Sequence, residues 1–330
     1  MLTKRQNMLE TIRGGKPDRY VNQYEALSML MVNPYFTKYP LFPELGGPPV
    51  RNAWGVYNVW PKGTPGSFPV HDEEHILLKD ITKWRDYVHA PNIMFSEADW
   101  APAIEAMEQV DRKEYFATAF VAPGIFEQTH HFQEIQRALV NYFVEPDYTK
   151  ELINYIADWE ITYAEQLCKY LKPDAIFHHD DWGSQVSTFI SPDMFEEFLL
   201  PAYKRVYGYY KDHGVEVIVH HADSYCATLV PYMIEMGIDV WQGAMHSNNV
   251  PELLKKYGPD LTIMGAIDSA MVDYPGWTPE AVEKAVRKVC DECGTKYFIP
   301  CITQGLGIST FPGVYECASE VIDKISKEKF

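Results

Sequence analysis

Short apolar runs alternate with longer amphipathic segments through the second half of the chain. Several of these runs are rich in β-branched residues and alternate with a period of two, which is typical of buried strands. They predict strands over residues 175–181, 215–223, 239–242, 262–268 and 297–302. Near the amino terminus, a helix over residues 3–13 is followed by a first strand expected over residues 17–24.

The segments between the strands predict helices. They cover residues 193–213, 226–236, 250–257 and 279–293, and Gly294 ends the last of them. Strands alternating with helices indicate a parallel sheet with right-handed crossovers. We therefore expect an α/β fold, a (β/α)8 TIM barrel formed by residues 1–330 as a single domain. An open doubly wound sheet is the competitor, but it usually carries a G-x-G-x-x-G phosphate turn, which this sequence lacks.

Polar side chains gather where the predicted strands end. On a strand, residues i and i+2 point to the same face of the sheet. A histidine, aspartate or cysteine at the end of a strand can therefore lie on the same face as the core side chains that precede it. In a barrel, the carboxyl ends of the strands form the active site. The sequence therefore predicts an active site there. The side chains concerned are His179 and Asp181, His221 and Asp223, His246, and Cys301.

The first third of the chain has a different character. Residues 1–110 form an amino-terminal extension before the main barrel at 111–330, and residues 33–69 are rich in Pro, Gly and aromatic residues. Long irregular segments often form lids or substrate-binding walls, and aromatic side chains suit an aromatic ligand. The alternative is that these rings cover the open end of the barrel or an interface. Our candidates for substrate binding are Tyr24, Trp54, Tyr57, Gln185 and Gln242.

Composition excludes several classes of partner. A net charge of -17 argues against nucleic acid and against an anionic membrane surface. The sequence contains no apolar stretch of membrane-spanning length and starts in a polar amphipathic segment, so we expect a cytoplasmic protein. The six cysteines are scattered, which does not favour a disulfide framework. The sequence leaves open whether the protein forms a homodimer.

Several motifs resemble the uroporphyrinogen decarboxylase superfamily. They are GIDVWQG at 237–243, PELLKKYG at 251–258, MGAID at 264–268, DDWGSQ at 180–185 and PGIFE at 123–127, within a resemblance that spans about residues 115–325. The decarboxylases of this superfamily carry an early arginine-rich motif that binds tetrapyrrole carboxylates. Here Arg19 stands alone, which disfavours porphyrinogen decarboxylation.

The other branch of that superfamily comprises cobamide-dependent methyltransferases. The resemblance implies a zinc ion bound by a His-x-Cys pair after one strand and by a Cys after a later one. His221 and Cys301 match this pattern, while Asp223 occupies the place of the first Cys. The chain lacks the Asp-x-His-x-x-Gly motif of cobalamin carriers, so the resemblance implies that a separate corrinoid protein carries the cobalamin.

Exchange of a thiolate for a carboxylate makes zinc a stronger Lewis acid, suited to withdrawing charge from a substrate oxygen. We therefore expect a zinc-dependent methyltransferase that moves a methyl group, from an aryl methyl ether, to the cob(I)alamin of a corrinoid protein. Asp181, His179 and His246 would orient the substrate or supply a proton.

Three alternatives stay open at the level of sequence. One is a uroporphyrinogen decarboxylase-type decarboxylase, and another is a methylcobamide:thiol methyltransferase with a coenzyme M-like acceptor. The third is a non-catalytic barrel that binds an aromatic ligand or a corrinoid protein. Methylamines and thioethers also remain possible methyl donors.

Overall fold

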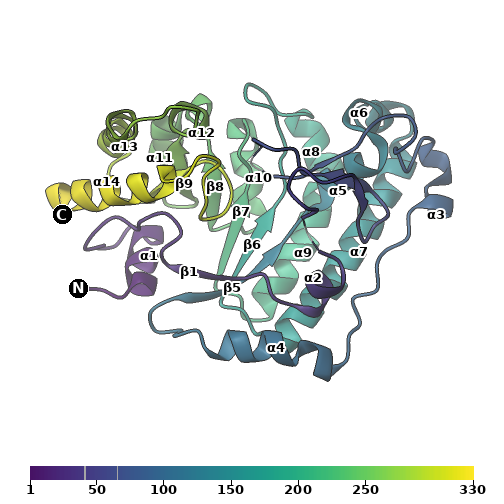
Figure 1. Cartoon of the computed structure of the whole chain (residues 1–330), viewed down its shortest axis with the longest axis horizontal. Helices are drawn as coiled ribbons and strands as arrows, with labels where there is room; N and C mark the ends of the chain where they lie inside the picture. Colours follow the sequence, from purple (N-terminus) through teal and green to yellow (C-terminus); the bar gives the residue numbers. More distant parts are fainter. Residues whose placement is uncertain (41, 65) are drawn as a thin grey trace.

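In the computed structural model, which describes residues 1–40, 42–64 and 66–330, a seven-stranded parallel sheet forms the centre of the molecule (Figure 1). Its order, β1-β5-β6-β7-β8-β9-β10, follows the chain, so each strand is added beside the previous one. The strands are β1 (Leu27–Leu30), β5 (Phe116–Val121), β6 (Ala175–His179), β7 (Val217–His221), β8 (Val240–Ala244), β9 (Thr262–Ile267) and β10 (Phe298–Ile302). The strands predicted after residue 170 are confirmed.

The sheet curls around an apolar interior of its own. One buried cluster gathers side chains from all seven strands, among them Phe120, Phe177 and Val219. No ladder joins β10 to β1 among the described strands. Tyr24 fills part of the interior there, and the Gln23 Oε1 atom accepts a hydrogen bond of 3.2 Å from the Ile302 N–H. The predicted eight-stranded barrel is thus realised as a barrel-like sheet of seven strands.

The predicted first strand over residues 17–24 is wrong. The chain there is irregular, and β1 begins at Leu27. Gln23 has a φ of 52°, outside the extended region that a strand requires. The Gln23 side chain donates to the Ser319 hydroxyl at 2.7 Å, so this segment is held by the carboxy-terminal helix.

Helices surround the sheet (Figure 1). The predicted helices at 250–257 and 279–293 are confirmed, whereas residues 193–213 form two helices that meet at Leu199. Pro201 follows that junction and lacks the N–H that would continue a single helix. The helices are α1 (Lys4–Ile12), α2 (Pro34–Lys38), α3 (Trp84–Tyr87), α4 (Glu97–Glu108), α5 (Ile125–Gln133), α6 (Ile135–Val144), α7 (Pro146–Tyr170), α8 (Pro192–Phe198), α9 (Leu200–Asp212), α10 (Val230–Glu235), α11 (Val250–Tyr257), α12 (Ser269–Val272), α13 (Pro279–Cys293) and α14 (Val314–Lys329), with 3-10 turns at Ile81–Lys83, Ala227–Leu229 and His246–Asn248.

The two ends of the sheet differ. Helix α1 lies at the amino ends of the strands, where Arg5 pairs with Asp174 at 3.1 Å and with Glu216 at 2.6 Å, just before β6 and β7. Helix α5 lies at the carboxyl ends, where its first backbone N–H groups meet the Asp180 carboxylate. The predicted site residues therefore gather at the end opposite α1.

The amino-terminal segment adds a small antiparallel sheet of β2 (Val50–Arg51), β3 (Tyr57–Val59) and β4 (Phe68–Pro69). Trp54 lies between β2 and β3 and is 5 % exposed. Its ring centroid is 5.6 Å from that of Phe132 and 5.0 Å from that of Trp159, so it packs against α5 and α7. Across the described ranges, no helix is long and apolar enough to cross a membrane.

Candidate metal centre

Strands β6 and β7 end side by side and bring two histidines together. His179 pairs in register with His221, and their ring centroids are 4.4 Å apart. Asp181 follows β6 on the same side. One donor atom from each of the three side chains lies within 4.8 Å of the other two. Two imidazoles and one carboxylate at this spacing can hold a divalent metal ion.

Each histidine is oriented through its Nδ1 atom. The His179 Nδ1 lies 2.9 Å from Glu127 Oε2, and the His221 Nδ1 hydrogen-bonds Gln242 Oε1. The amide of Gln242 is fixed in turn, because its Nε2 donates to the Ile302 carbonyl at 3.3 Å. Since both partners of the imidazoles are acceptors, Nδ1 carries the proton and Nε2 is left for a metal. This arrangement is the usual second layer around metal-bound histidines.

The two imidazoles have opposite electrostatic environments. Burial opposes charge on His179, but the carboxylate of Glu127 outweighs it and raises the pKa of His179 to about 10. Burial and the neighbouring charge of His179 lower the pKa of His221 to about 4. Without a metal, one imidazole is therefore protonated and the other is neutral. A metal cation would take the place of the proton on His179.

Helix α5 positions Glu127. The Asp180 carboxylate accepts hydrogen bonds from the N–H groups of Phe126 at 2.9 Å and Glu127 at 2.8 Å, so the end of β6 caps α5. A Cβ at Gly124 would lie 2.5 Å from the Cβ of Asp180, which allows only glycine at this approach. Sequence reasoning missed Glu127 as a site residue. The available signal was an acidic residue in the first turn of a helix that follows a strand.

Asp223 and Cys301 lie beside the His179–Asp181–His221 group but are not members of it. The Asp223 N–H donates to Asp181 Oδ1 at 2.8 Å, and burial together with the Asp181 charge raises the pKa of Asp223. Cys301 belongs to the buried interior, with Sγ 3.8 Å from the Nε2 of Gln242, and burial raises its thiol pKa. Their role as metal ligands stays a prediction.

The other predicted site residues are dispersed. Tyr24 lies inside the sheet and donates to the Gln304 carbonyl at 3.4 Å. The ring of Tyr57 packs on His75 with centroids 4.8 Å apart, and Gln185 is exposed in the loop after β6. His246 stands at the rim with its Nδ1 2.6 Å from Asp268 Oδ2. Of the substrate-binding candidates, Gln242 is the one that contacts the histidine pair.

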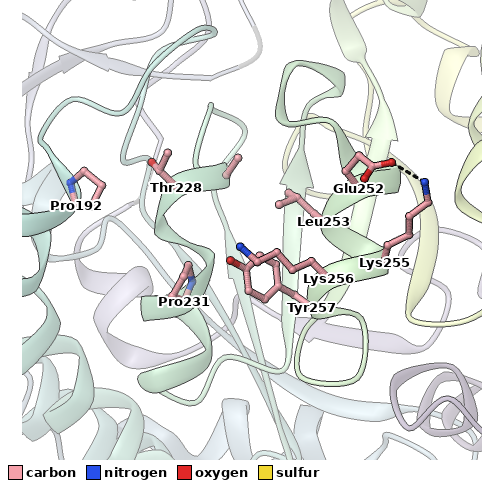
Figure 2. A pocket seen from close by; sticks show the side chains of 9 residues that line it. Pro192, Thr228, Pro231, Glu252, Leu253, Lys255, Lys256 and Tyr257 are labelled. Carbon is pink, nitrogen blue, oxygen red and sulfur yellow. Dashed lines mark hydrogen bonds and ion pairs between the residues drawn. The ribbon is translucent and has the colours of Figure 1, made fainter.

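A surface hollow of about 690 Å³ lies elsewhere, on the outside of the sheet near α10 and α11 (Figure 2). Its lining includes Thr228, Pro231, Leu253, Lys256 and Tyr257. None of the three side chains of the candidate metal centre lines it. We therefore locate the chemistry at the strand ends.

The fold and the site together define a class, a barrel-like α/β protein with a histidine–carboxylate group at the carboxyl ends of its strands. The chain belongs to the uroporphyrinogen decarboxylase family, since the family described as Uroporphyrinogen decarboxylase (URO-D) matches residues 129–316. A solved structure of a methyltransferase from Methanosarcina mazei is similar in fold, with a TM-score of 0.63 and 11% sequence identity, covering 98% of this chain and 99% of that chain. A search of curated proteins found no match.

Loss of the Glu127 carboxylate should weaken the metal centre without removing a ligand. We expect Glu127→Gln to lower zinc affinity by roughly 10- to 100-fold, because partners of this kind hold the tautomer and basicity of a ligating imidazole. Competition with a chromophoric chelator measures the change. Glu165→Gln, at an exposed position of α7, is the matched control and should bind zinc as the unmodified chain does. Equal affinity in both variants would contradict the role of Glu127.

Proposed function

We propose that this chain is a zinc-dependent methyltransferase that moves a methyl group from an aryl methyl ether to the cob(I)alamin of a separate corrinoid protein. The observation that carries the proposal is the His179–Asp181–His221 group at the strand ends of a uroporphyrinogen decarboxylase family member. Three protein ligands of this kind are typical of catalytic zinc, which keeps one position open for substrate.

The donor set supports an oxygen-containing methyl donor. The group holds two nitrogens and one oxygen, and a site without thiolates makes bound zinc a stronger Lewis acid. Zinc bound there would withdraw charge from the ether oxygen, where negative charge builds as the methyl group leaves. Activation of a thiol acceptor such as coenzyme M favours a thiolate-rich zinc site. A methylcobamide:thiol methyltransferase is therefore the weaker alternative.

The chain's own residues would hold the metal, orient the ligands and supply a proton. Glu127 and Gln242 fix the two imidazoles. His246 is 65% exposed and its Nδ1 is held by the buried Asp268, which leaves Nε2 turned away from the carboxylate. That imidazole is suited to give a proton to the released phenolate oxygen.

The interior wall next to His221 suits an aromatic ring. The ring of Phe177 stacks on His221 with centroids 5.9 Å apart, and Phe120 stacks on Phe177 at 5.8 Å. Phe36, from the aromatic amino-terminal segment, lies 6.3 Å from Phe120. These three phenylalanines are the basis for proposing an aromatic methyl donor.

The decarboxylase alternative would require basic residues at the site to bind the carboxylates of a tetrapyrrole, and the arginine expected for this role lies elsewhere. The Arg19 guanidinium bonds the Leu2 carbonyl at 3.1 Å and pairs with Asp18, so it serves the amino-terminal segment. Within the described part of the chain, no lysine or arginine pairs with Asp181 or Asp223. A carboxylate-rich tetrapyrrole would therefore meet an acidic site rather than a basic clamp.

Methyl transfer is the direct test. Zinc-loaded protein is mixed with cob(I)alamin, free or on a corrinoid protein, and a panel of methoxyarenes, and the absorbance of the corrinoid is followed. We expect conversion to the methylated form with at least one methoxyarene, and a rate at least about 100-fold lower for His221→Ala, because zinc is lost. Transfer from none of the methoxyarenes would refute the proposal.

A further inference from the structure

A single tyrosine hydroxyl of α9 is bonded to both chain neighbours of Asp181. Tyr203 is fully buried, and its hydroxyl donates a hydrogen bond to Asp180 Oδ2. The same oxygen accepts a hydrogen bond of 3.1 Å from the indole N–H of Trp182. A third contact, of 3.2 Å, comes from the backbone N–H of Phe126 at the start of α5. Asp181 therefore lies between two residues that are held by one side chain of a surrounding helix.

The same hydroxyl is connected to His179 through Asp180. The Asp180 carboxylate also accepts hydrogen bonds from the N–H groups of Phe126 at 2.9 Å and Glu127 at 2.8 Å, so it fixes the first turn of α5. Glu127 Oε2 in turn lies 2.9 Å from His179 Nδ1. An unbroken series of contacts therefore leads from Tyr203 to a donor group of the candidate metal centre.

The direction of the hydrogen bonds at this hydroxyl is fixed. Burial, followed by the charge of Asp180, raises the pKa of Tyr203 well above its usual range, so the hydroxyl keeps its proton. The indole N–H of Trp182 and the backbone N–H of Phe126 can only donate, which leaves the hydroxyl proton for Asp180. Burial raises the pKa of Asp180, while Tyr203 and the first turn of α5 act in the opposite direction and favour the carboxylate. Hydrogen bonds to an ionised carboxylate are strong, so this one is held firmly in place.

We propose that Tyr203 is a positioning residue of the metal centre, whose hydroxyl fixes the spacing of Asp181 and His179 at which they bind the ion. It acts through the two neighbours of Asp181 and through Glu127, and not by contact with the metal. Metal affinity is sensitive to groups of this kind, since they orient the ligands around the ion. The inference rests on the metal centre of the proposed function but does not depend on the methyl donor.

Tyr203→Phe removes the hydroxyl and keeps the ring. We expect it to lower zinc affinity about tenfold, the lower end of the range for groups that orient metal ligands, because it acts through other residues. Competition with a chromophoric chelator measures the affinity. With cobalt(II) bound in place of zinc, the visible absorption should also change, since it responds to the geometry of the ligands.

Tyr163→Phe is the matched control, the same substitution of a buried tyrosine in α7. The Tyr163 hydroxyl accepts a hydrogen bond of 3.0 Å from Asn33 Nδ2, and its ring packs against Tyr35 and Trp159. Both variants should have a lower melting temperature, because each loses a buried hydrogen bond. Zinc affinity and the cobalt(II) spectrum should change in Tyr203→Phe and stay the same in Tyr163→Phe.

A double variant tests the route through Glu127. In a chain that already carries Glu127→Gln, Tyr203→Phe should lower zinc affinity by less than about threefold, because two groups that act through the same contact are not additive. The loss that remains is the part transmitted through Asp181. A tenfold loss both with and without Glu127→Gln would contradict the route from Tyr203 to His179.

The outcomes separate this inference from the proposed function. Unchanged zinc affinity in Tyr203→Phe would overturn it, and so would an equal loss of affinity in Tyr163→Phe, since the hydroxyl would then only support the fold. If Tyr203→Phe does not fold, Asp180→Asn interrupts the same route, and unchanged zinc affinity in that variant would overturn the inference.

Methyl transfer by the unmodified chain, with zinc binding unaffected in Tyr203→Phe, would refute the positioning role alone. The expected changes in zinc binding, without methyl transfer from any methoxyarene, would refute the proposed function alone. Absence of zinc binding by the unmodified chain would refute both.

Discussion

Replacement of His179 or His221 by alanine is expected to remove stoichiometric zinc from the protein, whereas Cys301→Ala should retain it. His179, Asp181 and His221 place their donor atoms within 4.8 Å of one another, and Cys301 is not in that group. Loss of one ligand should weaken binding by more than about 100-fold, since zinc sites with four ligands bind with about 10–16 kcal/mol in total. Elemental analysis of dialysed protein gives the metal content.

The comparison decides between two ligand sets that share His221. The family resemblance implies His221, Asp223 and Cys301, and the geometry groups His221 with His179 and Asp181. If Cys301→Ala lost zinc and His179→Ala kept it, the ligands would be His221, Asp223 and Cys301. His179 would then contact the substrate and not the metal. His213→Ala, at an exposed position after α9, controls for removal of any histidine.

Trp54→Ala should destabilise the protein strongly and leave substrate affinity in the folded protein unchanged. Its ring is buried against Phe132, Tyr155 and Trp159, outside the sheet interior. Truncation of a buried tryptophan costs about 3–5 kcal/mol in the free energy of unfolding. Urea unfolding measures the stability, and calorimetry with 2-methoxyphenol measures the affinity.

Phe36→Ala is the counterpart in the same amino-terminal segment. Phe36 is partly buried and packs against Phe120 in the sheet interior, so its loss should reduce affinity for the methoxyarene by roughly tenfold or more while costing less stability. If Trp54→Ala weakened binding as much as Phe36→Ala, the result would support the sequence-based expectation that Trp54 contacts the substrate.

The sequence determined the strands after residue 170 and which way their side chains point. The period-two pattern of residues 215–223 assigned Val217, Val219 and His221 to one face, and the structure places them in or beside the interior. The same alternation places His178 and His220 on the opposite face of the sheet, towards the surrounding helices. There they bond Tyr207 of α9, the His220 Nδ1 at 2.8 Å, as buried partners between sheet and helices.

Only the tertiary structure decided which of these side chains meet. Alternation along one strand fixes a face but carries no information on the register with its neighbour. The pairing of His179 with His221 follows from the β6–β7 register. The contact of Glu127 with His179 joins residues 52 apart in the chain through the capping of α5 by Asp180. Such partners depend on long-range packing, which the local hydrophobic pattern does not encode.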